Sequence, residues 1–172
     1  MKDLYRNIAA LTLPGLLAAT TLSGTVVLAC MMPFAAIAAI AALAMPVRRG
    51  MGAVTVSWLG NQVLGFGVLG FPWDGATFAA GLSLLAASLL AFAAARAVRD
   101  AAGNPVLAFV AALGAFEGSL LAYALAFGDV AMFAPGIVAQ VALNEALWFA
   151  GLWLGCQVLA RIPALDGGRS AA

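Results

Sequence analysis

The stretch MPFAAIAAIAALAMPVRRG, residues 32–50, places a short apolar segment between two prolines and ends it with two arginines. It closes an apolar run that begins near residue 8 and ends near residue 46. That run is too long for one membrane-spanning helix, which needs about 20 residues. Ser23–Gly24 is a weak point for a helix, and Pro33 suits a first helical turn. We therefore expect two helices here, at about 7–29 and 32–46. The second is short, and we expect it to be little tilted or partly interfacial.

The composition of the whole chain is that of an integral membrane protein. Of the 172 residues, 65% are hydrophobic and 9% are charged, whereas soluble domains have about 45–50% and about 25%. Further apolar runs predict helices at about 51–70, 75–96, 105–127 and 136–160. We predict an all-α, polytopic protein: a single transmembrane domain over residues 1–172, built as a compact bundle of six helices. Residues 161–172 then form a short cytoplasmic tail.

The basic residues decide between five and six spans. With six spans and a cytoplasmic N-terminus, all eight fall on one side of the membrane: Lys2, Arg6, Arg48, Arg49, Arg96, Arg99, Arg161 and Arg169. If residues 8–46 formed one span, the arginines at 48, 49, 161 and 169 would move to the other side, leaving four on each side. The positive-inside rule favours six spans with both termini cytoplasmic. The alanine-rich composition is typical of a GC-rich bacterial genome, so we expect a bacterial inner (cytoplasmic) membrane.

Net charge and residue types exclude several function classes. The formal net charge is +1, which gives no reason to expect a nucleic-acid partner. There is no histidine, which removes the commonest metal ligand and the usual general base. We expect no metal, no cofactor and no enzymatic activity.

Three of the expected helices carry polar residues at a similar depth, slightly outside the midplane. Asn61 and Gln62 lie about nine residues from the outer end of their helix, and Glu117 lies about ten residues from the outer end of its own. Charges at such a depth cost at least about 2.5–3.5 kcal/mol, so intramembrane ionisable residues are candidates for a functional site. The candidate binding residues are Trp58, Asn61, Gln62, Glu117, Gln140, Asn144, Glu145 and Trp148.

The outer loop FPWDG, residues 71–75, lies above one of these helices. Trp73 and Asp74 in this loop are candidates for a cover over the mouth of the site. An ordinary turn with an interfacial aromatic anchor explains the same residues equally well.

The residue types indicate what such a site would bind. No lysine, arginine or histidine lies in the interior of the expected spans, since Arg96 stands at the inner end of its span, so an anionic ligand would find no counter-charge. Two carboxylates with amides and tryptophans suit a cationic or neutral, aromatic, hydrogen-bonding small molecule that enters from outside. Amides also hydrogen-bond helices to one another in lipid, so a purely structural role remains open.

The stretch MPFAAIAAIAALAMPVRRGMGAVTVSWLGNQVLGF, residues 32–66, resembles the second and third helices of the S components of energy-coupling factor (ECF) transporters. Six short-looped helices with cytoplasmic termini and a polar pocket in the outer half are also similar to that family. The family's alanine motif in the first helix would map onto Gly15 and Ala19, with glycine in place of the first alanine.

This resemblance implies a substrate-capture subunit for a vitamin or related micronutrient. It implies two further partners, a transmembrane coupling protein and cytoplasmic ATPases, and this chain has no phosphate-binding loop of its own. The thiamine-type members are similar in placing carboxylate, amide and tryptophan around a cationic ligand. Thiamine or its pyrimidine precursor is therefore the first expected substrate.

Three other classes of function stay open at this point. A proton- or cation-coupled carrier or channel would use Glu117 and Glu145 as a relay, but the inner half offers mainly Ser57 and Gln157 to continue it. An integral-membrane enzyme would have to work with the two glutamates alone. A membrane scaffold would use the polar residues to hold its helices together.

Overall fold

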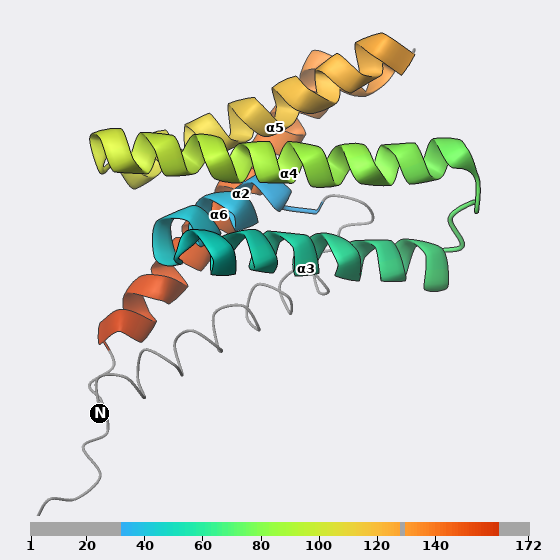
Figure 1. The fold of residues 1–172 in the computed structure, drawn as a ribbon. Helices are drawn as coiled ribbons and strands as arrows, with labels where there is room; N and C mark the ends of the chain where they lie inside the picture. Colours follow the sequence, from blue (N-terminus) through green and yellow to red (C-terminus); the bar gives the residue numbers. More distant parts are fainter. Residues whose placement is uncertain (1–31, 128–129, 162–172) are drawn as a thin grey trace, which may run out of the picture.

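The computed structural model describes residues 32–127 and 130–161, and this part of the chain is all-α, as predicted. The expected helix at 7–29 and residues 162–172 of the expected tail lie outside it. Figure 1 shows the arrangement of the elements. In chain order they are α2 (Phe34–Ala44), α3 (Val47–Gly67), α4 (Gly75–Ala102), α5 (Pro105–Phe127), the 3₁₀ turn η1 (Ala131–Phe133) and α6 (Pro135–Arg161).

Three of the described helices are long and apolar enough to cross a membrane: Gly75–Ala102, Pro105–Phe127 and Pro135–Val158. They indicate a multi-pass membrane protein. α3 has 21 residues, enough for a span by length, but it is not among these three because polar residues and glycines lower its hydropathy. α2 has 11 residues and is about 16 Å long, roughly half of a bilayer core.

α2 is the centre of the bundle, a burial that the expectation of a little-tilted or partly interfacial helix did not include. It packs against α3, α4, α5 and α6, and Figure 1 shows it enclosed among them. Every residue from Ala35 to Ala42 is fully buried. A helix that is apolar all round has no face to offer to a polar interface, so the core is the place where it is stable. Its alanines let the neighbouring backbones approach closely.

Two expected helix boundaries need correction. α3 begins at Val47, not at 51, so Arg48 and Arg49 lie in its first turn instead of in a loop. Met45 and Pro46 are extended, as a proline and its preceding residue prefer, and Pro46 is the residue from which α3 starts. α4 continues to Ala102, six residues beyond the expected end, and stops at Gly103, whose φ of 63° is left-handed.

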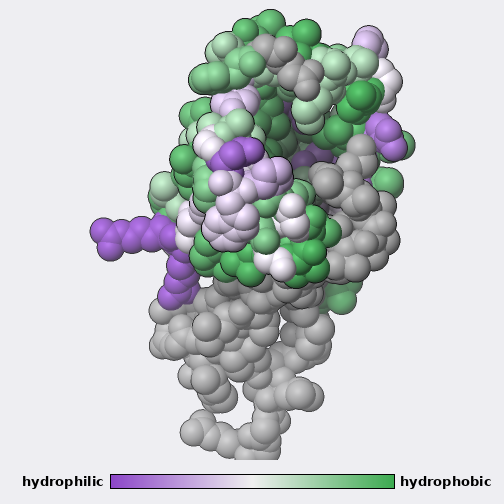
Figure 2. Space-filling model, turned by 90° about the vertical axis from the view of Figure 1, so that its right-hand side faces the viewer, coloured by the Kyte–Doolittle hydropathy of each residue, from purple (hydrophilic) through white to green (hydrophobic). Residues whose placement is uncertain are grey.

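The remaining connections are short and locally specified. Asn104 accepts hydrogen bonds from the backbone N–H groups of Val106 (2.9 Å) and Leu107 (3.1 Å), and Pro105 occupies the first position of α5. α5 therefore runs back along α4, and these two helices share the most extensive helix contact. Their outer surfaces are apolar. Figure 2 shows the predominance of hydrophobic residues over the described part of one face of the molecule.

Candidate functional site

The carboxylate of Glu145 on α6 binds the N-terminus of α2. Oε2 accepts a hydrogen bond from the backbone N–H of Ala36 (2.7 Å) and Oε1 accepts one from Ala35 (3.2 Å). The side chain is 1% exposed. A helix N-terminus carries free N–H groups and a partial positive charge, so a buried carboxylate is a fitting partner for it.

The other N–H groups at this end of α2 are also satisfied. Phe34 donates to the carbonyl of Met32 (2.9 Å), and Ile37 donates to that of Pro33 (3.0 Å), which begins the regular helical pattern. Pro33 has no N–H to satisfy. With Ala35 and Ala36 bound by Glu145, the first turn of α2 has no unsatisfied donor, which is what a helix end inside a bilayer requires.

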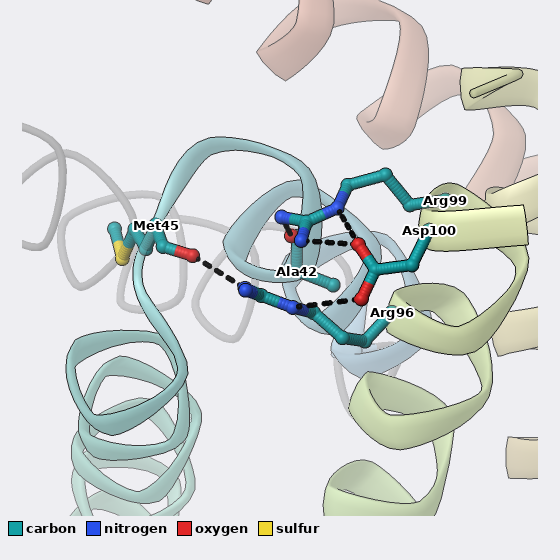
Figure 3. Close-up of polar contacts among 5 residues, drawn as sticks. All are labelled: Ala42, Met45, Arg96, Arg99 and Asp100. Atoms are coloured by element: carbon teal, nitrogen blue, oxygen red, sulfur yellow. Dashed lines mark hydrogen bonds and ion pairs between the residues drawn. The ribbon is translucent and has the colours of Figure 1, made fainter.

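The opposite end of α2 is held by two arginines of α4, as Figure 3 shows. Arg99 donates from Nη1 to the carbonyl of Ala42 (2.6 Å), and Arg96 donates from Nη1 to that of Met45 (2.8 Å). Asp100 links the two guanidinium groups, accepting a hydrogen bond from Arg99 Nε (2.8 Å) and lying 3.7 Å from Arg96 Nε. Cations at a helix C-terminus complement the helix dipole. α2 is thus bound by a carboxyl group at its N-terminus and by cations at its C-terminus.

Glu117 on α5 lies near the same end of α2 as Glu145. The ring of the preceding residue, Phe116, has its centroid 6.2 Å from that of Phe34 in the first turn of α2. The carboxyl groups of Glu117 and Glu145 are close enough to interact electrostatically. Glu117 is half-buried, and within the described part of the chain it has no hydrogen-bond or ion-pair partner.

The space beside Glu117 is open within the described structure. A Cβ added at Gly114 or at Gly118 would meet no atom within 4 Å. Within the described residues, these two glycines on α5 therefore leave room for a group to approach the carboxylate.

The other candidates on α6 differ in their surroundings. Asn144 is half-buried and has an interaction partner of its own. Trp148 packs partly buried against the core. Gln140, one turn before Asn144, is exposed. Only Asn144 and Trp148 therefore remain close to Glu145 as candidates for the wall of a site.

The candidates on α3 lie elsewhere, because α3 packs chiefly against α2 and α4 and not against α5 or α6. Trp58 donates from Nε1 to the carbonyl of Gly81 on α4 (2.7 Å). Gln62 lies against the same glycine. Asn61 is half-buried and does not line the groove that these residues form. The structure therefore separates the predicted set into a group around Glu117 and Glu145 and a group around Trp58 and Gln62.

The two candidate cover residues have different roles. Trp73 is 75% exposed and packs on Phe66, with ring centroids 4.9 Å apart. It lines the groove beside Trp58 and Gln62. Asp74 is the N-cap of α4, where Oδ1 accepts a hydrogen bond from the backbone N–H of Thr77 (2.8 Å). That N–H, with the Thr77 hydroxyl, lowers the pKa of Asp74 below its ordinary value of 3.8.

Several residues that shape these two groups were missed at the sequence level. Arg96 and Arg99 were considered only as positive charges on the inner side of the membrane, although their side chains bind α2. Gly81 and the aromatic residues Phe66 and Phe78 were not singled out. Phe66 lies four residues after Gln62 and Phe78 lies three residues before Gly81, spacings that place each pair on one face of its helix. These spacings indicate a shared groove only once α3 is known to pack against α4.

Neither a metal site nor a known relative indicates a function for these residues. Within residues 32–127 and 130–161 no group of three or more His, Cys, Asp or Glu side chains is placed to hold a metal ion. Comparison of the chain with known protein families, curated proteins and solved structures found no match.

Proposed function

We propose that this protein is the substrate-capture subunit of a membrane transporter, with six spans and both termini in the cytoplasm of a bacterial cell. Its substrate is a small cationic or neutral aromatic molecule. The observation that carries the proposal is the pair of glutamates at the N-terminus of α2, of which Glu117 has no partner in the described part of the chain.

The arrangement of arginines supports the proposed orientation. Arg96 and Arg99 contact the last turn of α2 and its connection to α3. Arg48 and Arg49 lie in the first turn of α3, directly after that connection. Four of the eight basic residues therefore gather at one end of the bundle, which the positive-inside rule assigns to the cytoplasm.

The position of α2 supports a site at mid-depth. Glu145 lies about ten residues into α6, roughly 15 Å from the start of that helix. The N-terminus of α2 meets α6 at this level. Half-length helices that end inside the membrane are a recurring feature of transporter binding sites, and here Glu145 binds the backbone N–H groups that such an end presents.

The charges of the site favour a positively charged or hydrogen-bond-donating ligand. The nearest arginines on α4 bind the opposite end of α2, about 16 Å away by the length of that helix. Glu117 and Glu145 therefore have no basic neighbour in the described part of the chain. A cationic group or a hydrogen-bond donor placed between them would find acceptor oxygens and no competing cation, and Trp148, on the same helix as Glu145, supplies an aromatic face.

The resemblance to S components of ECF transporters supplies the rest of this proposal. A transmembrane coupling protein and cytoplasmic ATPases would provide the energy, and thiamine or its pyrimidine precursor is the first substrate to test. Asn61 and Gln62 lie on a helix that does not pack against α5, so they are not assigned to this ligand.

The test begins with the purified protein in mild detergent. Denaturation should release a stoichiometric small molecule that mass spectrometry finds and that a mock purification lacks. Thiamine and its pyrimidine precursor should raise the melting temperature of the wild type. Glu117→Gln should abolish that rise while the ligand-free melting temperature stays unchanged, and Ser119→Ala, two residues along α5, is the matched control. A full ligand-induced rise in Glu117→Gln would contradict the proposal.

A structural role is the second candidate function, and the two hydrogen bonds of Glu145 favour it. Both oxygens of that carboxylate already bind the backbone of α2. In this scaffold alternative Glu117 binds nothing, no ligand is released on denaturation, and no compound of the panel changes the melting temperature.

A further inference from the structure

A groove between α3 and α4 lies apart from the two glutamates. Its volume is about 350 Å³ and its lining is almost entirely apolar, within the range of about 300–1,000 Å³ that small-ligand sites occupy. We propose that this groove binds the apolar chain of a phospholipid from the surrounding bilayer, with the amide of Gln62 hydrogen-bonded to a carbonyl at the head of that chain. This site is independent of the substrate site proposed above.

The floor of the groove is built on Gly81. The Trp58 indole is fixed by its 2.7 Å hydrogen bond to the Gly81 carbonyl. The Gln62 amide packs against the Cα of Gly81, where a Cβ would lie 2.7 Å from Gln62 Oε1. Glycine at this position lets two polar side chains of α3 reach α4. The groove therefore has a defined floor.

The rim of the groove faces outward with apolar side chains. Leu59 and Val63 on α3 and Leu82 on α4 are all more than half exposed. α4 is one of the three candidate spans, so at its depth in a bilayer these side chains meet acyl chains. A strongly polar solute would find apolar walls and a single amide, which favours a lipid chain as the occupant.

Aromatic rings close one end of the groove. Phe66 stacks on Phe78, with centroids 4.9 Å apart, and also packs on Trp73 at 4.9 Å. Trp73 directly precedes Asp74, the cap of α4, so it lies at the end of that span, where tryptophan favours the membrane interface. The head of a bound chain therefore belongs at this end.

The amide of Gln62 supplies the polar contact at the right depth. Gln62 lies five residues before the end of α3, about 7 Å along the helix axis. It has no hydrogen bond to any residue that the structure describes. An amide in an apolar groove needs a hydrogen-bond partner, and the ester carbonyl of a phospholipid is an acceptor that a bilayer supplies.

The test uses a phosphatidylcholine with bromines on its acyl chain, which quenches nearby tryptophans. Trp58 is kept as the single reporter by replacing the other three tryptophans, Trp73, Trp148 and Trp153, with phenylalanine. In mild detergent the probe should quench Trp58 with a saturable dependence at low mole fraction. Quenching that rises linearly with the mole fraction of the probe, or no quenching, overturns the proposal.

Variants distinguish the groove from the general lipid-facing surface. Val63→Phe and Leu82→Phe, from opposite walls, should each weaken the apparent affinity at least about tenfold. Val110→Phe on α5, equally an exposed valine, should leave the affinity unchanged. Circular dichroism and the melting temperature select the variants that fold. Equal quenching in the wall variants and in Val110→Phe overturns the proposal.

Gln62→Leu tests the polar contact separately. Loss of one hydrogen bond should weaken phosphatidylcholine binding about two- to tenfold. The same variant should not change the quenching by a brominated alkane, which has no carbonyl to bind. An unchanged phosphatidylcholine affinity in Gln62→Leu overturns the assignment of Gln62 to the head of the chain.

Discussion

Glu145 Oε2 lies 2.7 Å from the backbone nitrogen of Ala36, a contact that joins residues 109 positions apart in the sequence. It places a carboxylate of α6 at the N-terminus of a helix only 11 residues long. A helix end buried within the protein, as this one is, cannot use bulk water to satisfy its terminal N–H groups. This contact is therefore a condition for α2 to occupy the centre of the bundle.

Glu145→Ala should destabilise the protein. It leaves the N–H groups of Ala35 and Ala36 buried without acceptors, and such unsatisfied groups cost about 1–3 kcal/mol. Relief of the buried charge offsets part of this cost. Glu145→Gln keeps one acceptor oxygen and should lose less. The melting temperature in detergent should therefore fall in the order wild type, Glu145→Gln, Glu145→Ala.

Glu117→Gln is the matched control for that series. Its carboxylate has no hydrogen bond within the described structure, so the ligand-free melting temperature should stay within error of the wild type. A fall as large as that of Glu145→Gln would show that both glutamates hold the bundle together. Equal stability of all three Glu145 forms would contradict the capping role.

Arg99→Ala should weaken the other end of α2. The carbonyl of Ala42 loses its donor and the helix dipole loses a cation, an effect of about 1 kcal/mol at a partly exposed site. Arg99→Lys should recover only part of this, because one ammonium cannot reproduce the guanidinium contacts to both Ala42 and Asp100. Thermal unfolding in detergent measures both variants.

Arg48→Ala is the control for a lost positive charge at the same end of the bundle. Arg48 is exposed, and no ion pair of it is found among the described residues, so its replacement should change the stability by less than about 0.5 kcal/mol. If Arg48→Ala and Arg99→Ala were equally destabilising, net charge and not the contact with Ala42 would be responsible.

The sequence predicted two helix starts well: α4 begins directly after Asp74 and α5 begins at Pro105, as expected. α5 coincides with the expected range for this reason. Pro46 and Gly103 mark boundaries by the same chemistry, but the boundaries expected there, at 51 and 96, were wrong. The end of α4 was misplaced because the apolar segment stops at the charged run Arg96–Asp100, whereas the helix continues to Ala102 and ends at Gly103.

The candidate site was predictable only in part, because it depends on which helices pack together. Equal depth was inferred for Gln62 and Glu117, and depth follows from the rise of a helix. The depth of a residue does not determine which residues of other helices lie beside it. α2 stands between α3 and the pair α5 and α6, so Gln62 meets Gly81 and Glu117 meets Glu145. The role of Glu145 was missed because backbone N–H groups leave no mark in the sequence.

The N-cap of α4 should make the stability depend on pH in acid. The pKa of Asp74 is lowered in the folded protein below the ordinary value of 3.8, mainly by the Thr77 backbone N–H. Its contribution is therefore complete above that ordinary value and is lost as the pH falls through the lower, folded value. The difference in melting temperature between wild type and Asp74→Ala should be constant near neutral pH and should shrink below about pH 4.

Asp74→Asn separates the cap from other acid effects. Asparagine is as good an N-cap as aspartate and does not titrate, so this variant should keep the stability of the wild type at neutral pH. On acidification its advantage over Asp74→Ala should persist, whereas that of the wild type disappears. If wild type and Asp74→Asn both lost their extra stability over Asp74→Ala in acid, a group other than Asp74 would be responsible for the acid sensitivity.

Gly50→Ala should destabilise the packing of α2 against its neighbours. A Cβ at residue 50 would lie 2.5 Å from Cε2 of Phe92 and 3.2 Å from the carbonyl oxygen of Ala41, so the Phe92 ring on α4 or the backbone of α2 must move. Overpacking of this kind costs about 1–3 kcal/mol. Gly52→Ala, in the same helix, meets no atom within 4 Å and should be neutral or stabilising by about 0.5–1 kcal/mol, because alanine favours the helix. The melting temperature should therefore fall for Gly50→Ala, and it should stay unchanged or rise for Gly52→Ala. A common shift for both would mean that glycine at these positions serves the flexibility of α3 and not its close approach to α2 and α4.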